Sequence, residues 1–162
     1  MMKFLYLILI TATLNSLTNC KSPAINWSYQ IECNGLGAQG IQSLKVKTRA
    51  NSKSNLRESA MKNAVHSAIF RGAPIGNTGC PKLPMVPMSA QNEEVNKKFF
   101  EEFFKNGGTY NTFIASSPVL ISPVTFISKG VYEGEYTVGV RYNALKQYLK
   151  ENKILHSFDN GM

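Results

Sequence analysis

Near Ala50 the hydrophobic period of this chain changes from that of a strand to that of a helix. In residues 41–50 (IQSLKVKTRA), Leu44 and Val46 alternate with lysines, which is the two-residue period of a half-buried strand. Beyond Ala50, apolar residues recur at helical spacing on one face: Leu56, Ala60, Ala64, Val65, Ala68 and Ile69. Because several of these residues are alanines, we expect the helix to pack closely against a sheet.

The ends and the polar side of this helix can also be predicted. Ser52 or Ser54 can cap its first turn, and Gly72 can end it. Its polar residues are expected to lie mostly outside: Arg57, Lys62 and Asn63. His66 has no acidic residue close in sequence, and the other histidine, His156, is distant. We therefore expect His66 to serve packing or the surface rather than catalysis.

A strand and a glycine-rich turn precede this region. Residues 27–33 (WSYQIEC) alternate large apolar with polar residues and predict a strand. Gly35, Gly37 and Gly40 then match the spacing of the dinucleotide-binding fingerprint. That fingerprint needs a helix after the glycines, whereas residues 41–50 have the period of a strand. We interpret the glycines as the bend of a hairpin and expect no cofactor.

The second half of the chain predicts a Phe-rich helix, further strands and a closing helix. Ser89 is expected to cap a helix over residues 90–106. Its aromatic stripe is expected to face the core: Phe99, Phe100, Phe103 and Phe104. Three segments have strand composition: residues 110–115, 119–128 and 134–141. Pro123 marks the middle one as an edge or bulged strand, and a helix over residues 142–154 closes the domain.

Together these elements predict an α+β fold, with one antiparallel sheet of about four to five strands and two to three helices packed on it. We expect a single compact domain over residues 27–155, followed by a loose tail over residues 156–162. This length is enough to bury a hydrophobic core.

The first residues, 1–19, predict a cleaved signal peptide. Lys3 is followed by an uncharged apolar run that is far shorter than the roughly twenty residues of a membrane-spanning helix. Residues 17–20 (LTNC) resemble the bacterial lipobox, in which the signal is cut before a cysteine that then carries lipid. Asn19 departs from the small residue usual at its position. Lipidation of Cys20 is the leading interpretation.

Lipidation would make residues 20–26 a tether between the lipid and the domain. A bacterial lipoprotein carries several acyl chains, so its anchoring in the membrane is stable. The alternative is an ordinary signal peptide, cut nearby, that leaves Cys20 as a free thiol.

The cysteine count supports an exported protein. If Cys20 carries lipid, Cys33 and Cys80 remain as an even pair in an oxidising compartment. A helix that runs back along the second strand ends near the hairpin bend, where these two cysteines can meet in a disulfide. The alternative is two separated thiols that merely pack. Neither C-x-x-C nor H-x-x-x-H occurs, so no metal site is expected.

The net charge of +8, or +7 once Lys3 has left with the signal, favours acidic partners. Outside the cytoplasm these are lipid head groups, lipopolysaccharide, cell-wall polymers or acidic protein surfaces. The sequence has no dense Lys/Arg run interleaved with stacking aromatics, so we do not expect nucleic acid as a partner.

Residues 73–88 contain four prolines and two glycines and predict an irregular loop that the disulfide ties down. Its apolar residues form a candidate docking edge: Leu83, Met85, Val86 and Met88. The alternative is that these side chains simply cover the core.

Several segments together resemble small lipoproteins of Bacteroidetes-type envelopes: QGIQSLKV, KNAVHSAIFRG, the helix end FFKNGG, and GEYTVGVRYNALKQYLK. At the level of fold, the chain is also similar to the α+β lipoprotein domains of curli-export, flagellar and cell-wall-synthase accessory systems. The resemblance implies an outer-membrane location, with Cys20 as the lipid site. It also implies an assembly or accessory role rather than an enzymatic one.

Three functions are therefore considered. The leading hypothesis is a non-enzymatic lipoprotein, on the periplasmic face or the cell surface, that serves an envelope protein assembly such as a secretion or contractile-injection apparatus. The second is a binding module for an anionic cell-wall or lipopolysaccharide ligand through a basic face. The third is a thiol enzyme that uses Cys80 and His66.

Overall fold

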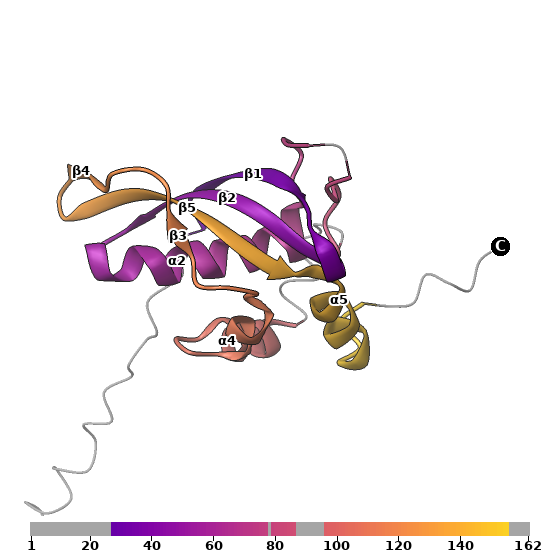
Figure 1. The fold of residues 1–162 in the computed structure, drawn as a ribbon. Helices are drawn as coiled ribbons and strands as arrows, with labels where there is room; N and C mark the ends of the chain where they lie inside the picture. Colours follow the sequence, from indigo (N-terminus) through magenta and orange to yellow (C-terminus); the bar gives the residue numbers. More distant parts are fainter. Residues whose placement is uncertain (1–26, 78, 87–95, 156–162) are drawn as a thin grey trace, which may run out of the picture.

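A computed structural model describes residues 27–77, 79–86 and 96–155 of the chain. These residues form a five-stranded antiparallel sheet and three α-helices, which confirms the predicted α+β fold in one domain (Figure 1). Several predictions lie outside the described residues: the signal peptide, Cys20 and its tether, Met88, the cap at Ser89 and the tail.

The sheet consists of β1 (Tyr29–Leu36), β2 (Ile41–Ala50), β3 (Val119–Leu120), β4 (Thr125–Ser128) and β5 (Val131–Arg141). The long strands β2 and β5 pair at its centre, and β1 pairs with the outer side of β2. The short strands β3 and β4 both pair with the side of β5 that faces away from β2. Strand β3 pairs near Tyr136, and β4 pairs closer to the start of β5, near Tyr132. The sheet therefore has two different edges, β1 and the β3–β4 segment (Figure 1).

The glycine-rich stretch forms the bend between β1 and β2, as predicted. The hairpin pairs Tyr29 with Thr48 at one end and Leu36 with Gln42 at the other. A short 3-10 turn, η1 (Ala38–Gly40), joins the two strands. A strand rather than a helix follows the glycines, so the geometry of the dinucleotide-binding fingerprint is not formed.

Helix α2 (Lys53–His66) covers one face of the sheet (Figure 1). Ser52 is its N-cap, and the Ser52 side chain accepts a hydrogen bond from the Asn55 N–H at 3.3 Å. The helix continues as a π-turn, η2 (Ser67–Arg71), and ends at Gly72, whose φ of 70° favours glycine. The predicted start and stop of this helix are confirmed.

Two further helices complete the domain. The Phe-rich segment forms α4 (Lys97–Phe104), with Phe100, Phe103 and Phe104 buried as predicted and Phe99 partly buried. Helix α5 (Tyr142–Glu151) directly follows β5 and buries Leu145 and Leu149. None of the helices formed by the described residues has the length and apolarity that crossing a bilayer requires.

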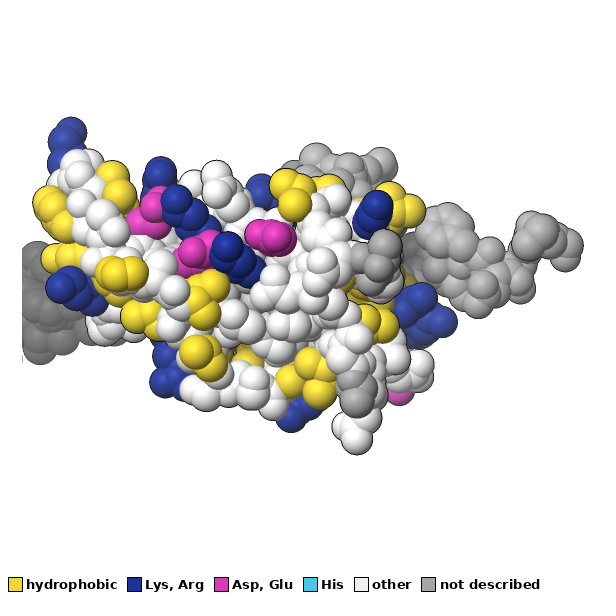
Figure 2. Space-filling model, turned by 45° about the horizontal axis from the view of Figure 1, so that its top comes forward, with side chains coloured by type: hydrophobic (Ala, Val, Ile, Leu, Met, Phe, Trp, Pro, Cys, Tyr) yellow, Lys and Arg dark blue, Asp and Glu magenta, His cyan; other side chains and the backbone are white. Residues whose placement is uncertain are grey.

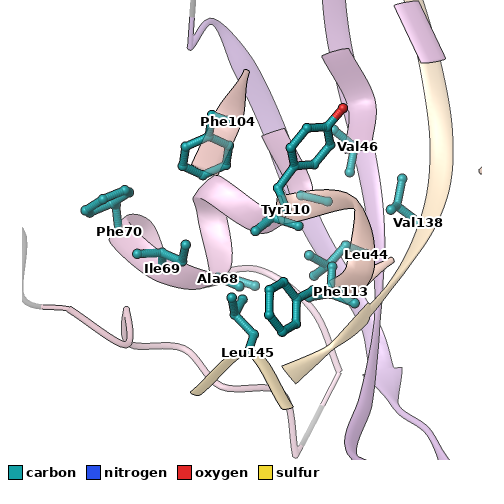
Figure 3. Packing of buried hydrophobic residues seen from close by; sticks show 14 of the residues in the cluster. Leu44, Val46, Ala68, Ile69, Phe70, Phe104, Tyr110, Phe113, Val138 and Leu145 are labelled. Atoms are coloured by element: carbon teal, nitrogen blue, oxygen red, sulfur yellow. The ribbon is translucent and has the colours of Figure 1, made fainter. Parts of the chain in front are cut away.

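The core lies between α2 and the inner face of the sheet (Figure 3). Alternate residues of the two central strands are buried there: Leu44, Val46, Tyr136, Val138 and Val140. The alanines of α2 let the helix approach these strands closely, and aromatic side chains from the second half of the chain pack around it. Burying this apolar surface is the main stabilising contribution to the fold.

The prediction of a strand over residues 110–115 is wrong, because the chain forms a short 3-10 helix there, η3 (Thr109–Phe113). Tyr110 and Phe113 are buried, and their spacing of three residues matches the period of a 3-10 helix. The Tyr110 hydroxyl donates a hydrogen bond to Glu58 Oε1 on α2 at 3.0 Å. This contact with α2 overrides the local strand composition.

Lys62 and Asn63 are buried, whereas the sequence placed them outside. Asn63 Nδ2 donates to Thr48 Oγ1 on β2 at 2.5 Å. Lys62 Nζ lies 2.7 Å from Asn106 Oδ1 and 3.2 Å from Glu58 Oε1. Because β2 and the connection between α4 and η3 cover this side of the helix, both polar groups are buried together with partners.

The segment 119–128 is divided into β3 and β4, with Pro123 between them, in agreement with its predicted place at an edge. A two-residue turn then connects β4 to β5. Its residues Lys129 and Gly130 both have positive φ, 47° and 78°, which matches the right-handed twist of the hairpin.

Candidate docking cleft at the β1 edge

A short stretch of the loop after α2 pairs with one end of the free side of β1. The Cys33 N–H donates to the Ile75 carbonyl at 2.9 Å, and the Cys33 carbonyl accepts from the Asn77 N–H at 3.0 Å. Gly76 thus lies beside Cys33 in a parallel bridge. A Cβ at Gly76 would lie 2.2 Å from the Cys33 carbonyl oxygen, so this close approach requires glycine.

The predicted disulfide between Cys33 and Cys80 is present and holds the same loop against β1. Helix α2 runs back along the sheet to His66, which contacts Tyr29 of β1, and the loop after η2 then brings the chain beside Cys33. The alternative of two separated thiols is therefore wrong. The bridge closes a loop of 47 residues. Chain entropy for such a loop is worth about 4 kcal/mol.

Toward the start of β1, the edge opens into a cleft of about 510 Å³. Outward and inward main-chain groups alternate along a strand, so those of Ile31 face the same side as those of Cys33. The outward N–H and C=O of Ile31 bond to no described residue. The side walls come from β1, from η2 and from the loop after it, and include Tyr29, Ile31, Arg71, Pro74 and Ile75.

Arg71 places a positive charge on the inner wall of the cleft. Its guanidinium carbon lies 4.6 Å from the centroid of the Tyr29 ring. Among the described residues, Arg71 forms no ion pair. On the outer wall, by contrast, Lys45 lies 3.2 Å from Glu135 and 3.8 Å from Glu32. The cleft therefore combines an open strand edge with an available guanidinium group.

The cations on the open face of the sheet are neutralised by neighbouring carboxylates. Glu133 forms ion pairs with two cations: Lys47 Nζ lies 3.0 Å from its Oε1 atom, and Arg49 Nε lies 2.9 Å from its Oε2 atom. Hydrogen bonds from Arg49 and then Lys47 lower the pKa of the Glu133 carboxyl. Figure 2 shows positive and negative side chains lying next to one another on the surface of the molecule. The paired charges make this face a poor binder of anions.

His66 packs against Tyr29, one of the residues that line the cleft. Its Nδ1 atom lies 2.7 Å from the Tyr29 hydroxyl, and its ring stacks on Trp27 with 3.7 Å between centroids. Burial, helped by the nearby charge of Arg71, lowers the pKa of His66 to about 3. The imidazole is therefore neutral at physiological pH. Of the two roles predicted from the sequence, packing and surface, the structure shows packing.

The docking edge predicted on the loop after α2 needs correction. Only Leu83 of its described residues is fully on the surface, with an exposed fraction of 78%. Val86 is buried and Met85 is partly buried against the core. Their N–H groups donate to the Ile69 and Ala68 carbonyls at the end of the helix, which the π-turn leaves without helical partners. This part of the loop covers the core.

Sequence reasoning brought Cys33 and Cys80 together but missed Arg71 and the open edge at Ile31. Arg71 appears in the sequence only as the last basic residue before a helix stop, and its place over Tyr29 depends on tertiary packing. No group of three or more His, Cys, Asp or Glu side chains within the described part of the chain could hold a metal ion.

The cleft can pair with the main chain of an extended peptide through Ile31 and can bind a carboxylate through Arg71. Comparison of the chain with family models, with curated proteins and with solved structures found no match.

Proposed function

We propose that this protein is a non-enzymatic lipoprotein of the outer membrane that serves an envelope protein assembly, such as a secretion or contractile-injection apparatus. Lipid on Cys20 anchors it, and the β1 edge binds an extended, acidic segment of the partner protein. The observation that supports this proposal most is the open main chain of Ile31 beside Arg71, which has no carboxylate partner among the described residues.

A peptide strand in the cleft would continue the line that residues 75–77 begin. Its main chain would bond to the outward N–H and C=O of Ile31, each bond contributing about 0.5–1.5 kcal/mol. Ile75, with an exposed fraction of 64%, and Pro74 offer an apolar surface for a side chain of the peptide. An acidic group of the peptide would bind Arg71, a charge-assisted contact that selects sequence as well as strand conformation.

The other two functions have less support. A basic face for anionic polymers needs free cations, but Lys45, Lys47 and Arg49 are paired with glutamates. A thiol enzyme needs a free Cys80, which is bonded to Cys33.

The lipid anchor can be tested separately from the cleft. Cells grown with labelled palmitate should label the native chain, and the Cys20→Ala variant should remain unlabelled. An unlabelled native chain would refute the lipoprotein part of the proposal. It would not test whether the cleft binds a partner.

Site-specific crosslinking in living cells tests the cleft. A photo-crosslinking amino acid in place of Ile75 should trap one defined envelope protein, and mass spectrometry should place the crosslink in an extended segment rich in Asp or Glu. Adding Arg71→Glu should reduce the yield. The matched control has the same crosslinker in place of Lys146, an exposed residue of α5.

Equal products from the Ile75 and Lys146 positions, or products at Ile75 that contain lipid alone, would overturn the proposal. A crosslink to one partner through a basic or helical segment would contradict the recognition mode while leaving an assembly role in place.

A further inference from the structure

The opposite edge of the sheet carries an apolar ridge, which we define by five side chains: Val119, Leu120, Ile121, Phe126 and Ile127. Their exposed fractions run from 43% for Ile127 to 60% for Val119. Figure 2 shows apolar side chains gathered at the end of the sheet where β4 lies. Large apolar side chains that gather along an exposed edge can mark an interaction site.

The apolar ridge presents side chains on both faces of the sheet. Leu120 and Phe126 are in register with Tyr136 and Tyr132, which belong to the helix-covered face. Val119 is in register with a residue of the open face, Thr137. A partner that docks on one face would cover only part of the ridge, whereas immersion of the edge in an apolar medium covers all of it.

Lysines border the apolar ridge. Residues 103–132 contain no Asp or Glu. Lys129 lies in the turn that ends β4, and Lys53 lies 5.7 Å from the ring centroid of Tyr132, which itself contacts Phe126. On β5, Glu133 and Glu135 lie across from Thr125 and Ile121, and both carboxylates are paired with cations of β2. With these carboxylates paired, the lysines beside the apolar side chains complement the boundary between acyl chains and anionic head groups.

The outer main chain of this edge also suits shallow insertion. Pro118 and Pro123 each lack an N–H group and so remove donors that would be costly to bury in lipid. The remaining groups can stay hydrated if only the side chains enter the acyl region, at a depth of roughly 5–10 Å.

The start of the described chain and the apolar ridge lie at the same end of the sheet. Tyr29 at the start of β1 is in register with Thr48 and Gly134, and Phe126 is in register with Tyr132, two residues farther toward that end. The start of β1 and β4 are three strand spacings apart, which is about 14 Å. Seven residues separate Cys20 from Trp27 and can span at most about 25 Å. A lipid on Cys20 therefore leaves the ridge within reach of the same bilayer.

We propose that the apolar ridge is a second membrane contact, which inserts edge-on into the surface of an anionic bilayer while Lys129 and Lys53 lie among the head groups. This inference rests on the proposed lipid anchor, which raises the effective concentration of the ridge at the membrane. The two contacts together would fix the orientation of the domain and leave the cleft at the β1 edge open to a protein partner.

Fluorescence quenching by brominated lipids tests this contact in the full chain. Phe126→Trp and Ile127→Trp proteins are purified from membranes and placed in vesicles of phosphatidylethanolamine and phosphatidylglycerol with brominated acyl chains. The added tryptophan should lose emission relative to unbrominated vesicles. Lys146→Trp, on exposed α5, is the matched control and should keep its emission, and Trp27 is a background common to all three.

Adding Lys129→Glu to Phe126→Trp should weaken the quenching, and vesicles of neutral phosphatidylcholine should do the same. Equal quenching in the ridge and control variants, or none in either, would overturn the membrane contact. Emission that shifts to the blue with protein concentration but is not quenched would assign the ridge to a second copy of the chain. If the purified protein retains the native Cys20 but mass spectrometry finds no lipid on it, quenching at Phe126 would support the membrane contact of the ridge and refute the lipid anchor.

Discussion

The two edges of the sheet differ in what they leave exposed. At the β1 edge, main-chain groups of Ile31 face a cleft beside Arg71. At the β3–β4 edge, Pro123 lies between the two short strands, and apolar side chains take the exposed positions. Natural sheets protect their edges by covering them or by breaking them. In this sheet the loop after α2 covers part of the β1 edge, whereas the other edge is divided into two short strands. The result is two chemically different surfaces on one small domain.

The two edges also differ in how they are supported. The cleft depends on contacts between distant parts of the chain: the disulfide, the Gly76 bridge and the packing of His66. The apolar ridge depends mostly on local pairing with β5 and on the turn at Lys129. Perturbations of long-range packing should therefore damage the cleft and spare the ridge.

The largest effect is expected from removing the disulfide. Cys33→Ser with Cys80→Ser should lower the free energy of unfolding by about 4 kcal/mol, because the unfolded chain regains the entropy of an open loop. Urea unfolding in detergent measures this change. Crosslinking from Ile75 should fall, while quenching at Phe126 should persist under conditions where the variant stays folded. An equal loss at both edges would show that they are not independent.

A smaller effect is expected from acidification. The pKa of His66 is about 3 in the folded protein, below its usual 6.5, so the unfolded chain binds a proton that the folded chain does not. Stability is therefore unaffected by His66 above pH 6.5 and falls as the pH drops from 6.5 toward 3. Between pH 7 and pH 5 the loss should be about 2 kcal/mol. Urea unfolding at these two values checks it.

The control for acidification is His66→Gln, which should be less stable at pH 7 but should lose less stability on going to pH 5. The same slope in both proteins would contradict the role assigned to His66.

Charge reversal at Arg71 should have a smaller effect again, confined to the cleft. Because Arg71 is an exposed cation, Arg71→Glu should weaken partner binding by about fivefold, and Arg71→Lys should weaken it less. The yield of the Ile75 crosslink measures this change. Lys150→Glu, an equal change of charge on exposed α5, is the control and should leave the yield unchanged.

The smallest effect on stability is expected at the apolar ridge. Phe126→Ser with Ile127→Ser should change the free energy of unfolding by less than about 0.5 kcal/mol per site, because both side chains are already exposed. Urea unfolding again provides the measurement. A loss of several kcal/mol would mean that the ridge packs against the core instead of facing a partner.

The sequence was sufficient for elements whose patterns are local. The alternation in β2 and β5, the cap at Ser52 and the stop at Gly72 were all predictable, because strand period and cap chemistry depend on neighbouring residues. The disulfide followed from the order of these elements.

The sequence predictions failed where tertiary contacts determine the local conformation or the burial of a residue. Tyr110 lies in a 3-10 turn because it packs under α2 and bonds to Glu58, which its own neighbours do not encode. Lys62 is buried because a distant amide, that of Asn106, partners it. The cleft was missed for the same reason, since Arg71 and Ile31 become neighbours only when the loop after α2 pairs with β1.

The most direct measurement places the same photo-crosslinker at both edges in living cells. In place of Ile75 it should trap an acidic, extended segment of one envelope protein, and in place of Phe126 it should trap lipid. Protein at Phe126 together with no specific product at Ile75 would contradict the assignment of the β1 edge to a protein partner and of the apolar ridge to the membrane.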